Sequence, residues 1–236
     1  NQTLEPEEIL IVDSSENKKS EDVVSKLISE FDGKINYLNF VGNPNQTRNY
    51  ACEGAKNELI AFLDDDDTWE KNYLELSLQK FKQHQIDFLF TSMNLINKNG
   101  DNIKFIDLPD EINLKDLFVY NHGFLCSNLI IKKEVFLNMG GFDSKSGSAD
   151  KDLAIRLVDK NYNYKINSLK IVNKRDSKKQ WTKNYLSMIK NNYLFFKRYK
   201  NQVDLSKKIH FFKKIIILFL KYLKSKFFKI YNYFFC

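Results

Sequence analysis

Short apolar runs recur along the first two thirds of the chain, and stretches whose apolar residues lie three or four positions apart separate them. A short apolar run between turn residues is typical of a buried strand, whereas spacing of three or four is typical of an amphipathic helix. The pattern therefore predicts strands at residues 8–12, 35–40, 58–63, 88–92 and 128–131. It predicts helices at residues 20–31, 46–56, 70–84 and from 148 on. Strands that alternate with helices indicate an α/β layer fold with a parallel or mixed sheet.

Four consecutive aspartates, residues 64–67, directly follow the third apolar run. Unpaired carboxylates are too costly to bury, so we expect these acids at the mouth of the strand, where a cation can reach them. Carboxylate oxygens suit Mg²⁺ or Mn²⁺, which share the rest of their shell with water and substrate phosphate. Asp64 and Asp66 lie two apart, so an extended backbone would point both the same way. A solvated acidic turn that caps the next helix is the alternative.

The charge of the chain is unevenly distributed. The 236 residues carry a net charge of +7, the acids cluster before about Asp152, and no acid follows Asp204. A basic end of this kind suggests an anionic partner, either a membrane surface or a polyanion. The three cysteines, Cys52, Cys126 and Cys236, lack the spacing of a metal site or a disulfide framework. We therefore expect a reducing, cytosolic setting in which the cysteines act as small apolar residues.

The basic end has the pattern of a long amphipathic helix. Its apolar stripe, with gaps of three or four, consists of Ile209, Phe212, Ile216, Leu220, Leu223, Phe227, Ile230 and Phe234. Lysines rim the stripe, and the longest unbroken apolar run is far below the roughly 20 residues that a membrane-spanning helix needs. We predict that residues 207–236 lie on an anionic membrane surface. Docking of this helix on the domain or on a partner chain is the alternative, and nucleic acid is not expected.

Five motifs in order resemble a known family. They are a strand that ends in Val-Asp-Ser-Ser, an Arg-Asn helix, the Phe-Leu-Asp-Asp-Asp-Asp-Thr-Trp run, a Gly-Gly-Phe-Asp turn and an Asp-Lys-Asp-Leu helix start. Together these motifs resemble family 2 glycosyltransferases. The resemblance implies a GT-A fold: a Rossmann-like three-layer sandwich with a mixed, mostly parallel sheet, here followed by C-terminal amphipathic helices. We expect the GT-A domain at residues 1–176 and the helical basic region at residues 177–236.

The resemblance implies that a sugar is transferred from a nucleotide diphosphate, most often a UDP-sugar, with inversion. Asp13 resembles the acid that holds the nucleotide base, for which an ordinary strand-end cap is the alternative. Arg48 resembles an arginine near the nucleotide, for which a surface pair with Glu53 is the alternative. Asp64 is then expected toward ribose or metal, Asp65 toward the nucleotide, and Asp66 on Mn²⁺ or Mg²⁺. A register shifted by one, to Asp65 and Asp67, stays open.

The last motif is expected to supply the general base that takes the proton from the acceptor hydroxyl. The family usually has a Glu-Asp pair here, whereas this chain has Ala149 and Asp150. That leaves Asp150 as the expected base, with Asp152 as the runner-up. An acid at a helix start that is favoured only by the macrodipole is the alternative for Asp152. The family's opening strand has no counterpart here, and Asn1-Gln2-Thr3 resembles the end of the helix that follows it, so we expect the first strand and helix to be missing.

These inferences define a leading hypothesis and two alternatives. The leading hypothesis is a metal-dependent, inverting glycosyltransferase, peripheral on the inner face of the cell membrane. It would use a nucleotide-sugar donor and a cell-surface glycan or lipid-linked acceptor. One alternative is a catalytically inactive module that binds nucleotide-sugar or metal. The other is a membrane-surface adaptor in which the acids only balance the basic end, and this predicts no donor affinity.

Overall fold

The computed structural model describes residues 1–15, 20–30, 34–146, 148–176 and 185–235, with the backbone alone for 29–30 and 227–235. Its strands are β1 (Ile9–Asp13), β2 (Ile35–Asn39), β3 (Leu59–Ala61), β4 (Thr68–Trp69), β5 (Phe88–Ile96), β6 (Asn102–Ile106), β7 (Leu129–Lys132) and β8 (Tyr164–Arg175). Its α-helices are α1 (Glu21–Glu30), α2 (Pro44–Gly54), α3 (Tyr73–His84), α4 (Leu114–Val119), α5 (Lys133–Asn138), α6 (Ala149–Asp159), α7 (Tyr185–Tyr199) and α8 (Leu205–Phe235). Two 3₁₀ turns, η1 (Cys126–Asn128) and η3 (Lys200–Gln202), complete the described elements.

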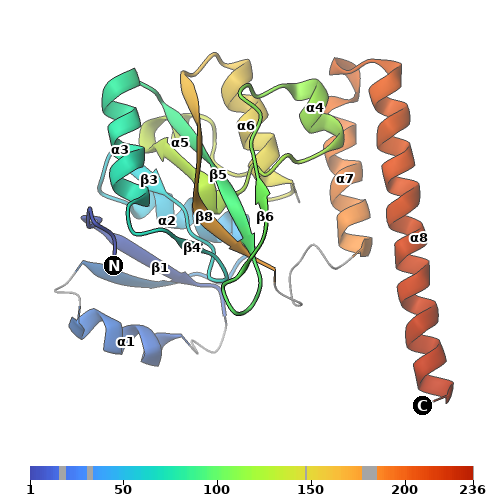
Figure 1. Cartoon of the computed structure of the whole chain (residues 1–236), viewed down its shortest axis with the longest axis horizontal. Helices are drawn as coiled ribbons and strands as arrows, with labels where there is room; N and C mark the ends of the chain where they lie inside the picture. The colour runs from blue at the N-terminus through green and yellow to red at the C-terminus, as the bar shows by residue number, and fades with distance from the viewer. Residues whose placement is uncertain (16–19, 31–33, 147, 177–184, 236) are drawn as a thin grey trace.

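The described strands form two sheets. β1 and β2 pair in parallel in a small sheet of their own, and the larger sheet has the order β3-β7-β5-β8-β4, with β6 paired to the far half of β5. Strand β5 runs parallel to β8, with Phe88 opposite Tyr164, and antiparallel to β7, with Phe88 opposite Ile131. The small sheet and α1 lie beside the larger sheet (Figure 1).

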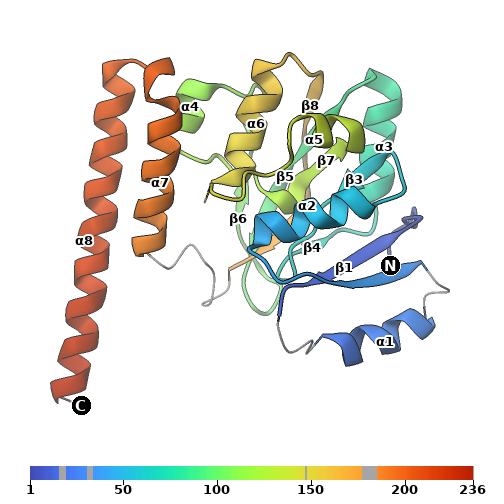
Figure 2. The ribbon, with the colours of Figure 1, turned by 180° about the vertical axis from the view of Figure 1, so that it is seen from behind.

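Side chains of β5 point alternately into two apolar cores. Phe88 and Phe90 enter the core shared with α5 and α6, whereas Leu89 and Met93 enter the core under α3. A strand whose two faces are both buried needs helices on each side of the sheet. Figures 1 and 2 show α3 on one face and α2, α5 and α6 on the other, so the main domain has three layers.

The predicted fold class is confirmed, with adjusted bounds. Helix α2 begins two residues earlier than expected, because Asn43 caps it with a capping box and Pro44 occupies its first turn. The predicted helix at 20–31 corresponds to α1, and Phe31 lies outside the described residues. The hairpin at Asn99 and Gly100 joins β5 to β6. The sheet is mixed as expected, but antiparallel pairings outnumber parallel ones among the described strands.

The strand expected at residues 58–63 ends early. Strand β3 stops at Ala61, and Leu63 is about half exposed. The acidic run that follows is a turn in which the Asp67 N–H donates to the Asp64 carbonyl at 3.1 Å. The argument that Asp64 and Asp66 share a side of an extended strand is therefore wrong. The chain bends because Thr68 and Trp69 pair with β8, on the far side of the sheet from β3.

The C-terminal helices pack side by side against α4 and α6 (Figure 1). Phe195 and Tyr199 of α7 and Phe211 of α8 are buried in the same core as the strands. The boundary expected at 176/177 adjoins residues 177–184, which lie outside the described part, and the division stays a prediction. In the part of the chain that the structure describes, we find no helix with the length and apolarity that a membrane crossing requires.

Helix α8 was expected either to lie on a membrane or to dock on the domain through its apolar stripe, and the burial of its side chains fits neither expectation fully. Phe211 and Leu218 face the domain, whereas Ile209, Phe212 and Ile216 of the predicted stripe are exposed. The helix is therefore docked, but through the face opposite the stripe. The side chains of the stripe from Phe227 on, together with Lys229 and Cys236, lie outside the described part.

Candidate active site

The acidic turn is anchored by Ser127 of η1. The Asp64 N–H donates to Ser127 Oγ at 3.1 Å, and Trp69 Nε1 donates to the Ser127 carbonyl at 2.7 Å. Ser127 is fully buried between the turn and β7. Both ends of the acidic turn are therefore fastened to one buried residue, which fixes where the carboxylates point.

Asp67 faces inward from the turn. It is buried, and its Oδ1 accepts from the Arg175 N–H at 3.1 Å. Burial raises the pKa of Asp67, against hydrogen bonds from Ser127 and Arg175 that lower it. A carboxylate used in this way holds β8 to the turn. The geometry favours the register with Asp64 and Asp66 over the one with Asp65 and Asp67.

Asp66 lies in a concentration of negative charge. Burial, followed by the charges of Asp64 and Asp65, raises the pKa of Asp66, and Lys174 of β8 opposes this effect. Asp65 itself is exposed. A cation would relieve this repulsion, and carboxylate oxygens suit Mg²⁺ or Mn²⁺. Within the described ranges, no three His, Cys, Asp or Glu side chains gather into a metal cage. Two carboxylates that leave the other positions to diphosphate and water do fit such an ion.

Arg48 brings helix α2 onto the acidic turn. Its Nη2 donates to Asp64 Oδ1 in an ion pair, and its guanidinium lies 5.9 Å from the centroid of the Phe142 ring. The expected alternative, a pair with Glu53, is not among the contacts of the described residues. Arg48 thus supplies a positive charge directly beside the carboxylates expected to meet the donor.

Asp150 stands in the first turn of α6 and reaches the same cluster. Cys126 Sγ donates to Asp150 Oδ1 at 2.8 Å. Burial raises the pKa of Asp150, while Cys126, Arg48 and Lys174 lower it and Asp64 raises it further. Burial likewise raises the pKa of the Cys126 thiol, which therefore stays protonated and donates. A partly buried carboxylate with a raised pKa is suited to accept a proton.

Asp152 is engaged elsewhere. Its carboxylate accepts from Arg156 Nε at 2.8 Å, Arg198 Nη1 at 2.6 Å and the Tyr199 hydroxyl at 2.7 Å. Its side chain is only 1% exposed. Three donors and two guanidinium charges therefore engage the carboxylate of Asp152 between α6 and α7. The geometry favours Asp150 over the runner-up as the base.

Asp13 lies on the small sheet at the end of β1. Its carboxylate accepts from the Ser15 N–H at 2.8 Å, the Ser20 N–H at 3.3 Å and the Tyr37 hydroxyl at 2.9 Å. These hydrogen bonds, the one from Ser15 first, hold the pKa of Asp13 well below its usual range. This is what a strand-end cap would show, and the expected contact with a nucleotide base stays a prediction.

Sequence reasoning missed three residues of the cluster. Cys126 and Ser127 belong to a Cys-Ser-Asn triplet directly before β7, and all three of its residues are buried. Three polar residues at the start of an apolar run are a signal that could have pointed to them. Lys174 near the end of β8 is the positive charge that the acidic turn needs opposite it, but its strand was not predicted.

A comparison with protein-family models decides the family. The family described as "Glycosyl transferase family 2" matches residues 1–140, more than half of the chain. The chain belongs to glycosyl transferase family 2. Every residue of the acidic turn, together with Arg48 and the Cys126–Ser127 pair, falls inside the matched range, whereas α6 with Asp150 follows it.

The curated relatives of this family 2 chain include proteins named as glycosyltransferases of O-antigen or teichuronic acid biosynthesis. The O-antigen biosynthesis glycosyltransferase WbnJ of Escherichia coli is 28% identical over 134 residues, 56% of this chain and 53% of the relative. The putative teichuronic acid biosynthesis glycosyltransferase TuaG of Bacillus subtilis is 30% identical over 130 residues, which cover 54% of this chain and 51% of TuaG. WfgD of Escherichia coli is named a UDP-Glc:alpha-D-GlcNAc-diphosphoundecaprenol beta-1,3-glucosyltransferase. It is 28% identical over 134 residues, which cover 56% of this chain and 51% of WfgD. The chain spans about half the length of these relatives.

Solved structures show the same fold. The structure of TarS residues 1–349 from S. aureus in complex with UDP-GlcNAc has a TM-score of 0.63 at 16% identity, and the match covers 89% of this chain and 62% of that solved chain. A likeness at this identity concerns the fold alone. It confirms for this family 2 chain the GT-A architecture that its motifs predicted.

Proposed function

We propose that this chain transfers a sugar from a UDP-sugar to a hydroxyl of a cell-surface glycan or lipid-linked acceptor, with inversion at the anomeric carbon. The observation that carries the proposal is the convergence of Arg48, Asp64, Asp66 and Asp150 from three separate parts of the chain. A module whose acids only balanced the basic end would not need a partly buried carboxylate that accepts a hydrogen bond from a thiol beside the acidic turn.

The donor is expected to lie against the acidic turn. Asp66 and Asp64 would hold Mn²⁺ or Mg²⁺, which stabilises the negative charge that develops on the leaving diphosphate. Arg48 and Lys174 add positive charge on either side of the turn, and electrostatic stabilisation of this kind is worth most in a partly buried site. Asp65, exposed at the tip, remains free to meet the nucleotide.

The acceptor hydroxyl is expected to lie next to Asp150. Inversion requires attack from the face opposite the leaving group, with removal of the hydroxyl proton by a positioned base. Asp150 takes that proton, a role worth roughly 10²–10⁴-fold in rate. Cys126 keeps one oxygen of Asp150 hydrogen-bonded and so orients the other toward the acceptor.

Helix α8 is proposed to hold the enzyme on an anionic membrane surface, on the inner face of the cell membrane. Ile209, Phe212, Ile216 and Leu220 are each about half exposed. Two lysines on the opposite face of the helix contact the domain: Lys207 pairs with Asp116 at 3.0 Å, and Lys214 donates to the Val119 carbonyl at 2.7 Å. The rim lysines 208, 213, 224 and 226 flank the stripe, which no acid accompanies. An apolar face flanked by lysines can insert into the membrane interface while the lysines attract anionic lipid headgroups.

A screen of nucleotide-sugars tests the donor assignment. The melting temperature of the full chain is measured with UDP-, GDP- and dTDP-sugars, each with Mn²⁺ and with EDTA. The proposal expects stabilisation by a UDP-sugar in Mn²⁺ that EDTA abolishes, because binding to the folded state raises its stability. Absence of any shift with all donors would favour the membrane-adaptor alternative. A shift without turnover would favour the inactive binding module.

A further inference from the structure

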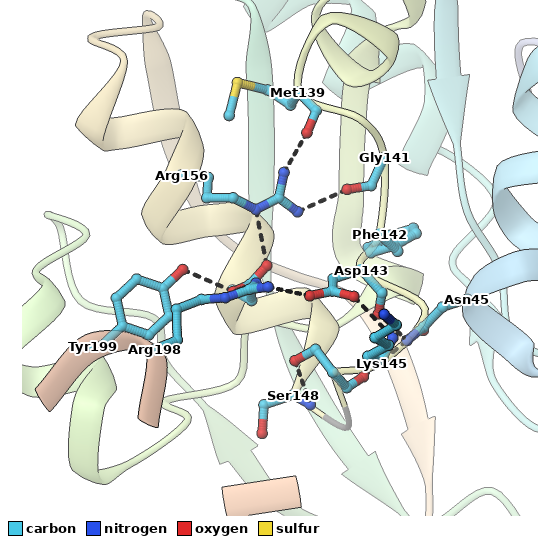
Figure 3. Close-up of polar contacts among 12 residues, drawn as sticks. Asn45, Met139, Gly141, Phe142, Asp143, Lys145, Ser148, Arg156, Arg198 and Tyr199 are labelled. Carbon is cyan, nitrogen blue, oxygen red and sulfur yellow. Dashed lines mark hydrogen bonds and ion pairs between the residues drawn. The ribbon is translucent and has the colours of Figure 1, made fainter. Parts of the chain in front are cut away.

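A network of charged side chains joins α6, α7 and the turn between α5 and α6. Figure 3 shows Arg156, Arg198 and Tyr199 converging from two helices, and all three donate to the carboxylate of Asp152. The second guanidinium nitrogen of Arg198 donates to Asp143 Oδ2. Arg198 therefore bridges two carboxylates, one on α6 and one on the turn.

The turn is tied to α2 as well. Asn45 Nδ2 donates to the carbonyls of Asp143 and Ser146, both at 2.9 Å. Asn49 exchanges hydrogen bonds with the backbone of Phe142, at 2.8 and 2.9 Å. Gly141 makes this approach possible, because a Cβ on it would lie 2.5 Å from Asn49 Oδ1 and its φ is +64°.

The two helices joined in this way carry the two sides of the candidate active site. Helix α2 brings Arg48 to Asp64, and the first turn of α6 brings Asp150 to Cys126. Asp152 lies only two residues beyond Asp150. Any rotation of the start of α6 that displaced Asp152 would displace Asp150 with it, since an α-helix moves as a rigid element over one turn.

Arg198 has a geometry that a simple charge could not reproduce. Its planar fork donates from Nη1 to Asp152 and from Nη2 to Asp143 at the same time. A lysine offers one ammonium group on a flexible stem and cannot span both carboxylates in a fixed geometry. Arg156 already pairs with Asp152 and also with the Met139 and Gly141 carbonyls, so a second arginine is not needed to compensate the buried charge.

We propose that Arg198 is a positioning residue for the transfer reaction: by holding Asp152 and Asp143 together, it sets the carboxylate of Asp150 against the pair of Arg48 and Asp64. Tyr199 assists by donating the third hydrogen bond to Asp152. This inference rests on the proposed function. It gives α7 a part in the reaction, in addition to its part in packing.

The test compares steady-state kinetics of the full chain with those of Arg198→Lys, using the UDP-sugar that the melting screen identifies. Misplacement of a reacting group by about 1 Å can cost up to about a hundredfold, so kcat is expected to fall tenfold or more. The donor KM and the calorimetric affinity for UDP are expected to stay within about twofold, because the carboxylates that Arg198 contacts are Asp152 and Asp143 and not those of the acidic turn. Tyr199→Phe, which removes one donor without changing charge, is expected to show a smaller fall of the same kind.

The matched control is Phe196→Leu on the same helix. The Phe196 ring packs on Phe211 with centroids 5.0 Å apart, so this variant loosens α7 against α8 without touching Asp152. It is expected to lose stability and keep kcat. An equal fall in kcat in the control, or an unchanged kcat in both Arg198→Lys and Tyr199→Phe, would overturn the inference alone. Wild-type chain without turnover would overturn the proposed function and this inference with it.

Discussion

Two neighbouring acids on one turn of α6 should respond to the same substitution in opposite ways. In Asp152→Asn, the Oδ1 side faces Arg198 and Tyr199 and the Oδ2 side faces Arg156, and all three are donors. Whichever way the amide lies, its NH₂ group meets a donor. In Asp150→Asn, the oxygen that accepts from Cys126 is kept.

The magnitudes follow from burial. Breaking a buried ion pair by removing one partner costs about 3–5 kcal/mol, and solvent at Arg198, whose side chain is 44% exposed, places Asp152→Asn near the lower end. For a chain of this size, about 3 kcal/mol lowers Tm by roughly 6–12 °C. Burial raises the pKa of Asp150, so the folded protein binds that proton more tightly than the unfolded chain and loses stability as pH rises through the folded pKa. A neutral Asn at position 150 avoids the loss of stability that comes from burying an ionised carboxylate, so Asp150→Asn is not expected to destabilise the fold at pH 7.

The assay combines urea unfolding of each variant with its turnover. Asp150→Asn should unfold at the same or a higher urea concentration than wild type and lose roughly 10²–10⁴-fold in kcat, with donor affinity unchanged. Asp152→Asn should unfold earlier and lose activity only in proportion to its folded fraction and to the displacement of Asp150. A stable Asp152→Asn without turnover, together with an active Asp150→Asn, would refute the assignment of the two acids.

Three further outcomes are expected. Asp66→Ala should abolish the Mn²⁺ dependence of UDP binding, and equal calorimetric affinity with EDTA in wild type would argue against a metal. Burial raises the pKa of Asp150, and the proposed base works only when ionised, so kcat/KM should fall in acid at a pH above the usual pKa of an aspartic acid. A fall at the ordinary pKa would contradict the assignment. The full chain should co-sediment with anionic liposomes, less so at high salt and least in the double variant Ile216→Glu, Leu220→Glu; binding indifferent to lipid charge and to these substitutions would count against the membrane surface.

Much of the fold was readable because its strands and helices carry clear local periods. Strand β5 opens with three consecutive apolar residues, Phe88–Phe90, and is buried on both faces there. The start of α2 was placed two residues late, because Asn43 and Pro44 are turn residues as well as helix-start residues. Strand β8 escaped prediction because its lysines and asparagines interrupt the apolar pattern. The end of β3 was misjudged because Asp67 turns inward to the N–H of Arg175, a partner 108 residues away.

The site residues named from the sequence stay predictions, and the structure brings Arg48, Asp64, Asp66 and Asp150 close together. The motifs made Asp150 the expected base and Asp152 the runner-up, and the pairing of Asp152 with Arg198 on α7 adds a structural reason for that order. Nothing local in the sequence relates residues 46 positions apart. The sequence also did not indicate which face of α8 docks on the domain, because Phe211 and Phe212 are adjacent and equally apolar. Packing on α4 and α7 selects Phe211 for burial.

Product stereochemistry tests the central claim most directly. The full chain with Mn²⁺, its preferred UDP-sugar and a lipid-linked acceptor is incubated beside Asp150→Asn, and the anomeric configuration of the new linkage is read by NMR. Transfer is expected to give a configuration opposite to that of the donor, and Asp150→Asn is expected to bind UDP without transferring sugar. A linkage that retains the donor configuration, or UDP bound with no sugar transferred, would contradict it.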